Sequence, residues 1–102
     1  MELFKRRSGS TLIITMRGEL DHHSAQQARG EIDAMLSDST VDTLSLDMRG
    51  ITFMDSSGLG VVLGRYKMMN ERKGKMRIVG ASKCAERIMK MAGIYSLVER
   101  EV

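Results

Sequence analysis

Apolar residues recur at two different periods along the chain, and segments with the two periods alternate. In short segments every second residue is apolar, as at Leu44, Leu46 and Met48, which is typical of strands. In longer segments apolar residues recur three or four positions apart, which is typical of helices. The order of the segments predicts two strands, then a helix, a strand, a helix, a strand and a helix, with a possible last strand.

The predicted elements are separated by turn and capping residues. Strands are expected at residues 3–7, 11–17, 44–48 and 76–79, and residues 95–102 are expected to form a short strand or an ordered tail. Three helices are expected. The first covers residues 22–37, the second follows the apolar stripe at residues 59–69 and ends at Lys73–Gly74, and the third runs from the capping residue Ser82 to Gly93.

This alternation of strands and helices predicts an α/β fold, with helices packed on a mixed, mostly parallel β-sheet. The opening hairpin around Ser8–Ser10 makes the sheet mixed. A chain of 102 residues fits one domain with a single core, which we assign to residues 1–102. Sites in open sheets gather at the carboxyl ends of strands. Asp21 and the segment 55–57 each follow a strand and precede a helix, so we expect them to share one edge.

Composition narrows the possible functions. The chain carries 16 basic and 13 acidic residues, a net charge of +3, and only four aromatic residues, which is too few for a base-stacking surface. Nucleic-acid binding is therefore not expected. Cys84 is the only cysteine, which suits a reducing compartment, and no apolar stretch approaches a membrane span. These features predict a cytoplasmic protein with no membrane contact.

The segment from Phe53 to Gly60, which reads Phe-Met-Asp-Ser-Ser-Gly-Leu-Gly, is the most informative part of the chain. It places an acid and two hydroxyls where a helix should begin. Such side chains cap helices, because their oxygens accept hydrogen bonds from unpaired backbone N–H groups. The same position suits a phosphate, because the N–H groups and the helix dipole favour an anion. Both interpretations remain open, and the second serine and the two glycines favour an exposed working loop.

Familiar catalytic and nucleotide-binding motifs do not fit this segment. Gly58-Leu59-Gly60 lacks a glycine at the third following position, so the dinucleotide fingerprint fails by one residue. The phosphate-binding loop ending in Gly-Lys-Ser/Thr is absent, and neither serine has the glycines that flank a hydrolase nucleophile. The dinucleotide-binding, phosphate-loop and hydrolase interpretations are therefore set aside, and no cofactor is expected.

The adjacent residues His22 and His23 invite a metal or catalytic interpretation. Neighbouring helical residues diverge by about 100°, so both rings cannot easily face one ion, and no second Cys/His cluster completes a site. A histidine could approach Ser57 as a base, but the spacing does not require it. We expect no metal site. Asp21 is expected to cap a helix, and its carboxylate could also pair with an arginine of a partner.

Two segments together resemble one protein family. Gly18–His23, followed by Phe53–Tyr66, resembles the bacterial anti-anti-sigma factors, which are single STAS domains. The Asp-His-His element and the Gly64-Arg65-Tyr66 sequence favour the sporulation members over the stress-response members. The resemblance covers nearly the whole chain. Members usually carry a further C-terminal helix, whereas this sequence stops at Val102, shortly after the expected last strand, so both a naturally short chain and a trimmed one remain open.

The resemblance implies a regulatory switch rather than catalysis. An unphosphorylated member binds an anti-sigma factor that is also a serine kinase, and this binding releases the sporulation sigma factor. The kinase then phosphorylates the second serine of the motif, here Ser57, and a metal-dependent serine phosphatase reverses the reaction. The residues alone do not distinguish Ser57 from Ser56. The expected partner surface comprises Asp21, Asp55, Ser56, Ser57, Gly58, Leu59 and Gly60. The alternative is a nucleotide-binding or scaffold STAS module that Ser57 phosphorylation does not regulate.

Overall fold

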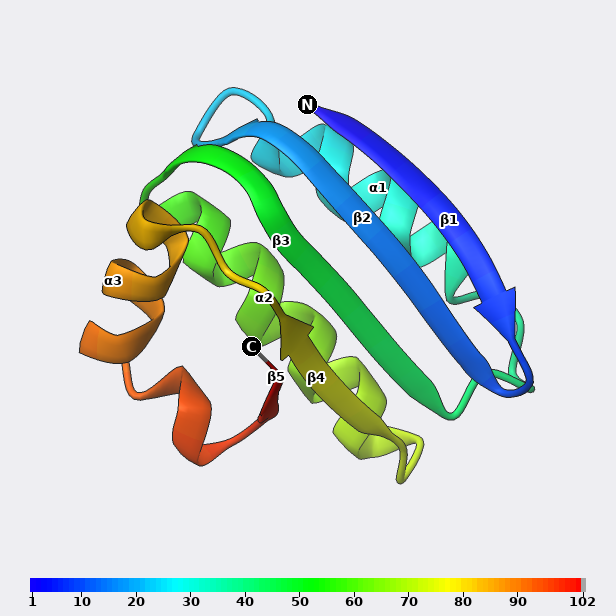
Figure 1. Ribbon diagram of the computed structural model, residues 1–102. Coiled ribbons are helices and arrows are strands. Elements are labelled where there is room, and N and C mark those ends of the chain that lie inside the picture. Colours follow the sequence, from blue (N-terminus) through cyan, green and yellow to red (C-terminus); the bar gives the residue numbers. More distant parts are fainter. Residues whose placement is uncertain (102) are drawn as a thin grey trace.

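The computed structural model describes residues 1–101, which form one five-stranded sheet with three α-helices and one 3-10 helix. The strands lie side by side in chain order, as Figure 1 shows. In chain order the elements are β1 (Glu2–Ser8), β2 (Thr11–Leu20), α1 (Ala25–Met35), β3 (Thr43–Met54), α2 (Ser56–Glu71), β4 (Lys75–Val79), α3 (Lys83–Met91), η1 (Ile94–Ser96) and β5 (Glu99–Glu101).

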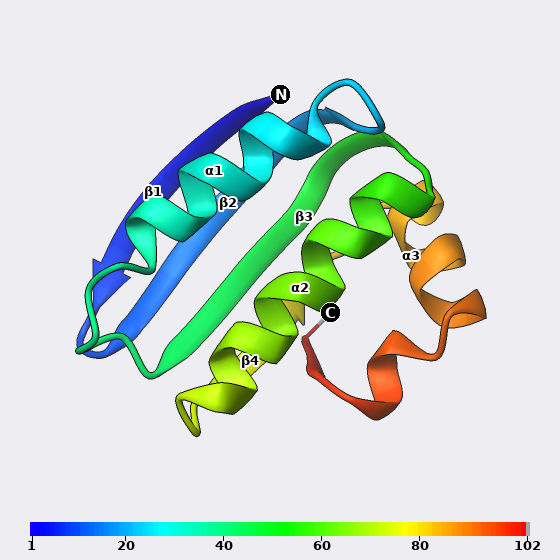
Figure 2. The same cartoon turned by 180° about the vertical axis from the view of Figure 1, so that it is seen from behind.

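The pairing of the strands confirms the predicted mixed, mostly parallel sheet. β1 and β2 form an antiparallel hairpin, whereas β2, β3, β4 and β5 pair in parallel. Each parallel pair is joined through a helix, as right-handed crossovers require. Figure 2 shows α1 and α2 lying across one face of the sheet, with α3 beside them. The opposite face, seen in Figure 1, carries no helix within residues 1–101.

The core lies between this helical layer and the sheet. Strands β2 and β3 turn alternate apolar side chains toward the helices, and the predicted residues Leu44, Leu46 and Met48 are all fully buried. Burial of this apolar surface is the main source of stability, at roughly 25 cal/mol per Å². α3 joins the same core through Ala85 and Met89. In the described residues, no helix is long and apolar enough to cross a membrane.

The two central strands are longer than the sequence predicted. β2 continues through residues 18–20, beyond the predicted end at residue 17, and β3 continues from Met48 to Met54. Parallel pairing between the two strands stabilises these extensions and compensates for weak alternation in the sequence. The register shifts between Thr15 and Arg17 and again between Gly18 and Glu19. These irregularities break the two-residue period, which is why the pattern did not reveal the strand.

The ends of the helices largely follow the predicted capping residues. Ser82 accepts a hydrogen bond from the Ala85 N–H at the start of α3, and Gly93 takes a left-handed conformation with φ 71° after its end. At the end of α2 the left-handed residue is Lys73, with φ 59°, rather than the expected glycine. Gly74 is needed for another reason: an added Cβ would lie 2.4 Å from the Asp42 carbonyl oxygen.

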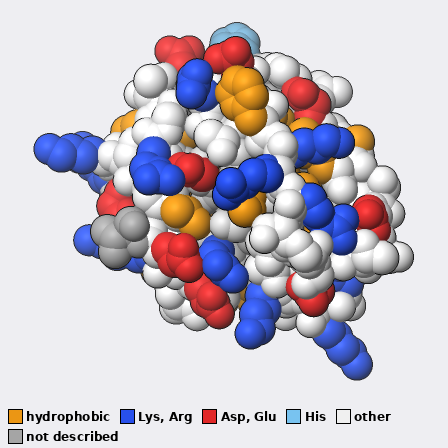
Figure 3. Space-filling view, turned by 45° about the vertical axis from the view of Figure 1, so that its right-hand side comes forward, with side chains coloured by type: hydrophobic (Ala, Val, Ile, Leu, Met, Phe, Trp, Pro, Cys, Tyr) orange, Lys and Arg blue, Asp and Glu red, His pale blue; other side chains and the backbone are white. Residues whose placement is uncertain are grey.

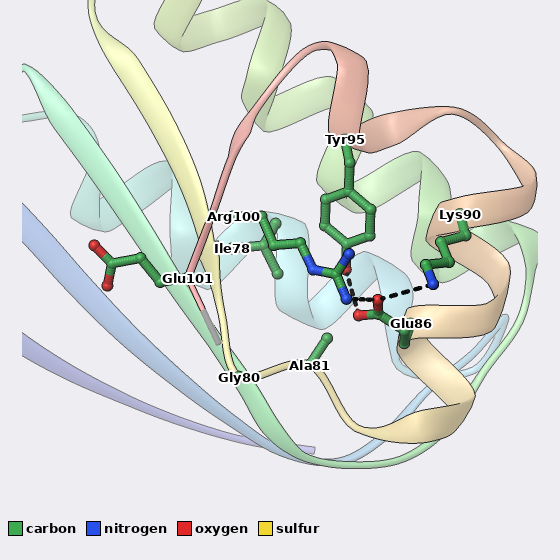
Figure 4. Close-up of a pocket in the computed structure, with 8 residues that line it drawn as sticks. All are labelled: Ile78, Gly80, Ala81, Glu86, Lys90, Tyr95, Arg100 and Glu101. Atoms are coloured by element: carbon green, nitrogen blue, oxygen red, sulfur yellow. Dashed lines mark hydrogen bonds and ion pairs between the residues drawn. The ribbon is translucent and has the colours of Figure 1, made fainter.

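Side chains that line a cavity of about 300 Å³ connect β5, the last strand, to α3. Figure 4 shows these side chains. Glu86 of α3 accepts a hydrogen bond from the Tyr95 hydroxyl at 2.9 Å and pairs with Arg100 of β5. The Arg100 guanidinium also lies over the Tyr95 ring, 4.6 Å from its centroid. Burial and the Glu86 hydrogen bond raise the pKa of Tyr95 to about 12. These contacts compensate for the shortness of β5.

Candidate functional site

The carboxyl ends of β2 and β3 meet at one edge of the sheet. Leu20 and Met54, the last residues of the two strands, are paired in register. Asp21 follows the first strand and Asp55 follows the second, so the two acids begin neighbouring loops. The expectation that both segments share one edge is therefore confirmed.

Asp55 caps α2 and also joins the two loops. Its Oδ1 accepts hydrogen bonds from the N–H groups of Ser57 at 2.9 Å and Gly58 at 3.2 Å. Its Oδ2 accepts from the His22 N–H at 3.2 Å, across from the β2–α1 loop. The carboxylate thus occupies the position at the helix start that favours an anion. Of the two interpretations of this segment, the capping one describes Asp55.

Asp21 caps the turn that leads into α1. Its Oδ1 accepts hydrogen bonds from the N–H groups of His23 at 2.9 Å and Ser24 at 3.1 Å, and the Asp21 N–H donates to the Ser24 hydroxyl at 3.0 Å. The backbone hydrogen bond from Ser24, followed by that from His23, lowers the pKa of Asp21 against the opposing effect of burial. A lowered pKa favours the ionised form in the folded state, so this stabilisation is present above pH 3.8 and disappears as the pH falls through the lowered pKa.

The turn at Asp21 explains why α1 begins later than predicted. Regular helix starts at Ala25 rather than at His22, because residues 22–24 form the turn that Asp21 caps. The Asp21 carbonyl oxygen accepts the Ala25 N–H at 2.9 Å, which carries the chain from the turn into the helix. No hydrogen bond to Asp21 Oδ2 occurs within residues 1–101. The cap therefore uses one carboxylate oxygen.

The two serines occupy the first positions of α2. Ser56 is exposed and Ser57 is half-buried, and both belong to the first turn of α2. The Ser57 hydroxyl makes no hydrogen bond with any described residue, and its oxygen is not fully buried. This hydroxyl is therefore accessible and chemically unengaged, since its own backbone N–H, and not its side chain, contacts Asp55.

The glycines of the motif have different structural requirements. Gly58 is buried, and a Cβ there would lie 2.4 Å from the Leu20 carbonyl oxygen and 2.9 Å from Leu20 Cγ. Gly58 therefore lets α2 approach the end of β2. Gly60 is exposed, and an added Cβ would meet no atom within 4 Å. Leu59 between them is half-buried against the core.

The two histidines lie in the turn on the exposed side of this edge. Their ring centroids are 5.9 Å apart and the planes are inclined by 68°, an edge-to-face arrangement. Within residues 1–101, no three or more His, Cys, Asp or Glu side chains are grouped as a metal site would require. His22 contributes its backbone N–H to the site and not its imidazole. Any residue type could supply this N–H, so the histidine in the sequence did not predict it.

Arg65 lies away from the exposed edge, between α1 and α2. It is 6 % exposed, and its Nε lies 3.1 Å from Asp33 Oδ1. Burial lowers the pKa of Arg65, and Asp33 opposes that effect. The arginine in the Gly64-Arg65-Tyr66 sequence therefore pairs the two helices.

Sequence reasoning did not include Phe53 in the candidate surface. The ring is 48 % exposed, although it stands directly before Met54 and the capping residue Asp55. Phe53 pairs in register with Glu19 of β2. The residue was missed because the predicted strand ended at Met48, so no alternation was available to orient the ring. A large exposed aromatic side chain is a signal that could have identified it.

Comparison with known protein families assigns this architecture. The model of the STAS domain matches residues 3–101. The chain belongs to the STAS domain family. The match covers all nine elements of this STAS domain, from β1 to β5.

Individual relatives are similar over most of this STAS domain. The anti-sigma F factor antagonist of Paenibacillus polymyxa is 36 % identical over 87 residues, which cover 85 % of this chain and 74 % of the relative. The solved structure of the anti-sigma factor antagonist SpoIIAA in its unphosphorylated form has a TM-score of 0.83 and 26 % identity, covering 99 % of this chain and 89 % of the other. The phosphorylated form of the Bacillus cell fate determinant SpoIIAA has a TM-score of 0.78 at 26 % identity, covering 99 % and 92 %.

Proposed function

We propose that this STAS domain is an anti-sigma factor antagonist and that the edge around Asp21 and Ser57 binds an anti-sigma factor. The observation that carries the proposal is the joining of the two loops by Asp55, which brings both polar segments to one edge of the sheet. The names of its relatives, which are antagonists of anti-sigma factors, support the choice of partner.

The proposed partner surface combines charge, hydroxyls and an apolar ring. Asp21 offers a carboxylate oxygen for a charge-assisted hydrogen bond from an arginine or lysine. Ser56 and Gly60 are exposed on α2, so a partner can approach the helix backbone closely. Phe53, two residues before Asp55, is an exposed apolar ring. Such a mixture of an apolar anchor and polar contacts is typical of specific interfaces.

We further propose that the anti-sigma factor is a serine kinase that phosphorylates Ser57, and that a metal-dependent serine phosphatase restores the hydroxyl. The accessible, unengaged Ser57 hydroxyl supports this, and so does the phosphorylated form of a structurally similar protein. In the reaction the Ser57 oxygen bonds to the γ-phosphorus of ATP, ADP leaves, and the hydroxyl proton is released. The kinase would supply every catalytic group, so this chain needs only to present the serine.

Replacing each serine in turn tests the acceptor. Incubation with the cognate kinase and labelled ATP should phosphorylate the wild-type chain and Ser56→Ala, whereas Ser57→Ala should incorporate no label. Ser57→Ala should remain folded, because Asp55 rather than the Ser57 side chain caps α2. Peptide mapping should recover the phosphate on Ser57 alone. Normal incorporation into Ser57→Ala would refute the assignment.

Asp21→Asn should weaken binding of the anti-sigma factor by roughly tenfold or more with little change in melting temperature. The asparagine Oδ1 can still accept the N–H groups of His23 and Ser24, so the turn is retained. The substitution removes only the negative charge. Calorimetry of binding and a thermal melt separate the two roles: unchanged binding with a lower melting temperature would mean that Asp21 acts only as a cap.

The same experiments separate the proposal from a nucleotide-binding or scaffold role. A module of that kind would bind a nucleotide, or a different protein, equally well with Ser57→Ala, Asp21→Asn or no substitution. Titration of the isolated domain with GTP and ATP is the direct measurement. Nucleotide binding without any interaction with an anti-sigma factor would favour the alternative.

A further inference from the structure

The broad face of the sheet opposite the helices is an unpartnered surface. Within residues 1–101 all three α-helices contribute to the core on the other side. β2 to β5 are parallel, and sheets that are mainly parallel are normally covered on both faces. This open face is distinct from the edge that holds Ser57, because it lies along the strands rather than at their carboxyl ends.

Apolar side chains lie on the open face among charged ones. Figure 3 shows this side of the molecule, with hydrophobic side chains surrounded by Lys, Arg, Asp and Glu. Phe4 of β1 is 47 % exposed. The same face has a shallow hollow of about 220 Å³, and its lining includes Ile13 and Val79. Exposed apolar groups in a hollow with a charged rim are typical of an interface.

The charges in the centre of the face are already neutralised. Arg49 Nη2 lies 2.9 Å from Asp47 Oδ2, and the hydrogen bond between these side chains raises the pKa of Arg49. The Arg49 stem packs against Gly80, where an added Cβ would lie 2.4 Å from Arg49 Cγ. The central residues therefore add no net charge to the open face, and the unpaired charges lie toward its two edges.

Positive charge is left unpaired on the β1–β2 side. Within residues 1–101, neither Arg6 nor Arg17 forms an ion pair. The Arg17 guanidinium lies over the Phe4 ring, 5.4 Å from its centroid, and Glu2 opposes Arg17 in the strand register without pairing to it. Two guanidinium groups on this side therefore have their hydrogen-bond donors available.

Negative charge is in excess on the β5 side. Glu99 and Glu101 share one cation, Arg77, at 3.9 Å and 3.2 Å. Their side chains are 60 % and 54 % exposed. One guanidinium cannot neutralise two carboxylates. The other cation of β4 on this face, Lys75, is at the opposite end of the strand and lies near Asp42, so a net negative charge remains around Glu99 and Glu101. The open face is thus positive at one side and negative at the other.

We propose that the open face is an interface between two copies of this chain, related by a two-fold axis parallel to the strands. This axis brings β1 of one copy over β5 of the other, so Arg6 faces the partner's Glu99 at the same level along the strands. Arg17 lies on the neighbouring strand β2, within side-chain reach of the partner's Glu101. The symmetry makes the same contacts twice. An axis across the strands would instead bring β1 over β1 and oppose like charges.

The open face is small for a stable dimer. Five strands about 4.8 Å apart and about seven residues long would span roughly 20 Å by 23 Å. β4 and β5 are shorter than that, so the face is smaller than a standard interface. A dimer held by so small a face is weak even at low salt. Rising salt screens the opposed charges and weakens it further.

A charge exchange tests both the interface and its orientation. Sedimentation of the full chain at millimolar concentration and low salt should detect the dimer. The variant Arg6→Glu/Arg17→Glu should be monomeric, and so should Glu99→Lys/Glu101→Lys, with dissociation constants raised by roughly tenfold or more. An equimolar mixture of the two variants should associate again, because each acidic edge then lies over a basic one.

Controls keep the result interpretable. Lys83→Glu reverses a charge on α3, outside the open face, and should leave the dimer intact. Circular dichroism checks folding, and if the β5 substitutions unfold the chain, the variant of β1 and β2 alone carries the test. A wild-type chain that stays monomeric, a dimer that Arg6→Glu/Arg17→Glu leaves unchanged, or folded variants that fail to associate in the mixture would overturn the proposal.

Discussion

Phosphorylation of Ser57 should lower the affinity for the anti-sigma factor by at least about a hundredfold, which corresponds to about 2.7 kcal/mol. The phosphate adds about −1.5 to −2 charges and considerable bulk at a half-buried position. Asp55 already engages the N–H groups of Ser57 and Gly58, so the helix start has little capacity left for a second anion. The phosphate oxygens would therefore be directed into the interface, where burial without a matching cation is costly.

The switch should operate without refolding the domain. Backbone NMR shifts recorded before and after phosphorylation should change around Ser57, Asp21 and the bridging residue Asp55. Ser57→Asp should reproduce the loss only in part, because it carries one charge and lacks a tetrahedral phosphate. Large shifts across α3 and β5 would show that a global change carries the switch. Undiminished binding of the phosphorylated chain would contradict the proposed regulation.

Gly58→Ala should destabilise the domain by about 2–3 kcal/mol and lower the melting temperature by roughly 10–20 °C. The new methyl group would lie 2.4 Å from the Leu20 carbonyl oxygen, which is backbone and cannot move aside independently. α2 would have to shift away from β2, and the hydrogen bond from His22 to Asp55 would lengthen. Thermal melts followed by circular dichroism measure the effect.

Gly60→Ala is the matched control for this substitution. It lies two residues away in the same helix, its added Cβ would meet no atom within 4 Å, and alanine favours a helix by up to about 1 kcal/mol. Gly60→Ala should therefore raise the melting temperature slightly. Equal melting temperatures for Gly58→Ala and the wild type would disprove the packing role of Gly58.

The sequence predicted the order of the elements and the mixed sheet because each depends on local periodicity and capping. Ser82 and Gly93 were assigned the capping positions they occupy, since their conformational preferences are local. The lengths of β2 and β3 were underestimated, because strand pairing stabilises residues that alternate poorly. The pattern had no information on such contacts between distant residues.

The candidate site was predicted in part for the same reason. Topology alone was enough to bring Asp21 and Asp55 to one edge. The hydrogen bond from His22 to Asp55 could not be predicted, because it uses a backbone N–H group and depends on how the β2–α1 and β3–α2 loops are placed relative to each other. The ion pair between Arg65 and Asp33 was also missed, since it depends on how α1 and α2 are spaced.

Because of the hydrogen bonds of Asp55, the candidate surface forms only when the whole domain is folded. One carboxylate joins two strand–helix units that lie 33 residues apart in the chain, so neither unit can form the surface alone. A chain with either crossover undocked would lack the arrangement of Asp21 beside Ser57. Because a partner would then bind only the folded chain, binding would stabilise the whole domain by mass action. Only fully folded copies would therefore compete for the anti-sigma factor, and damaged copies would be left unbound.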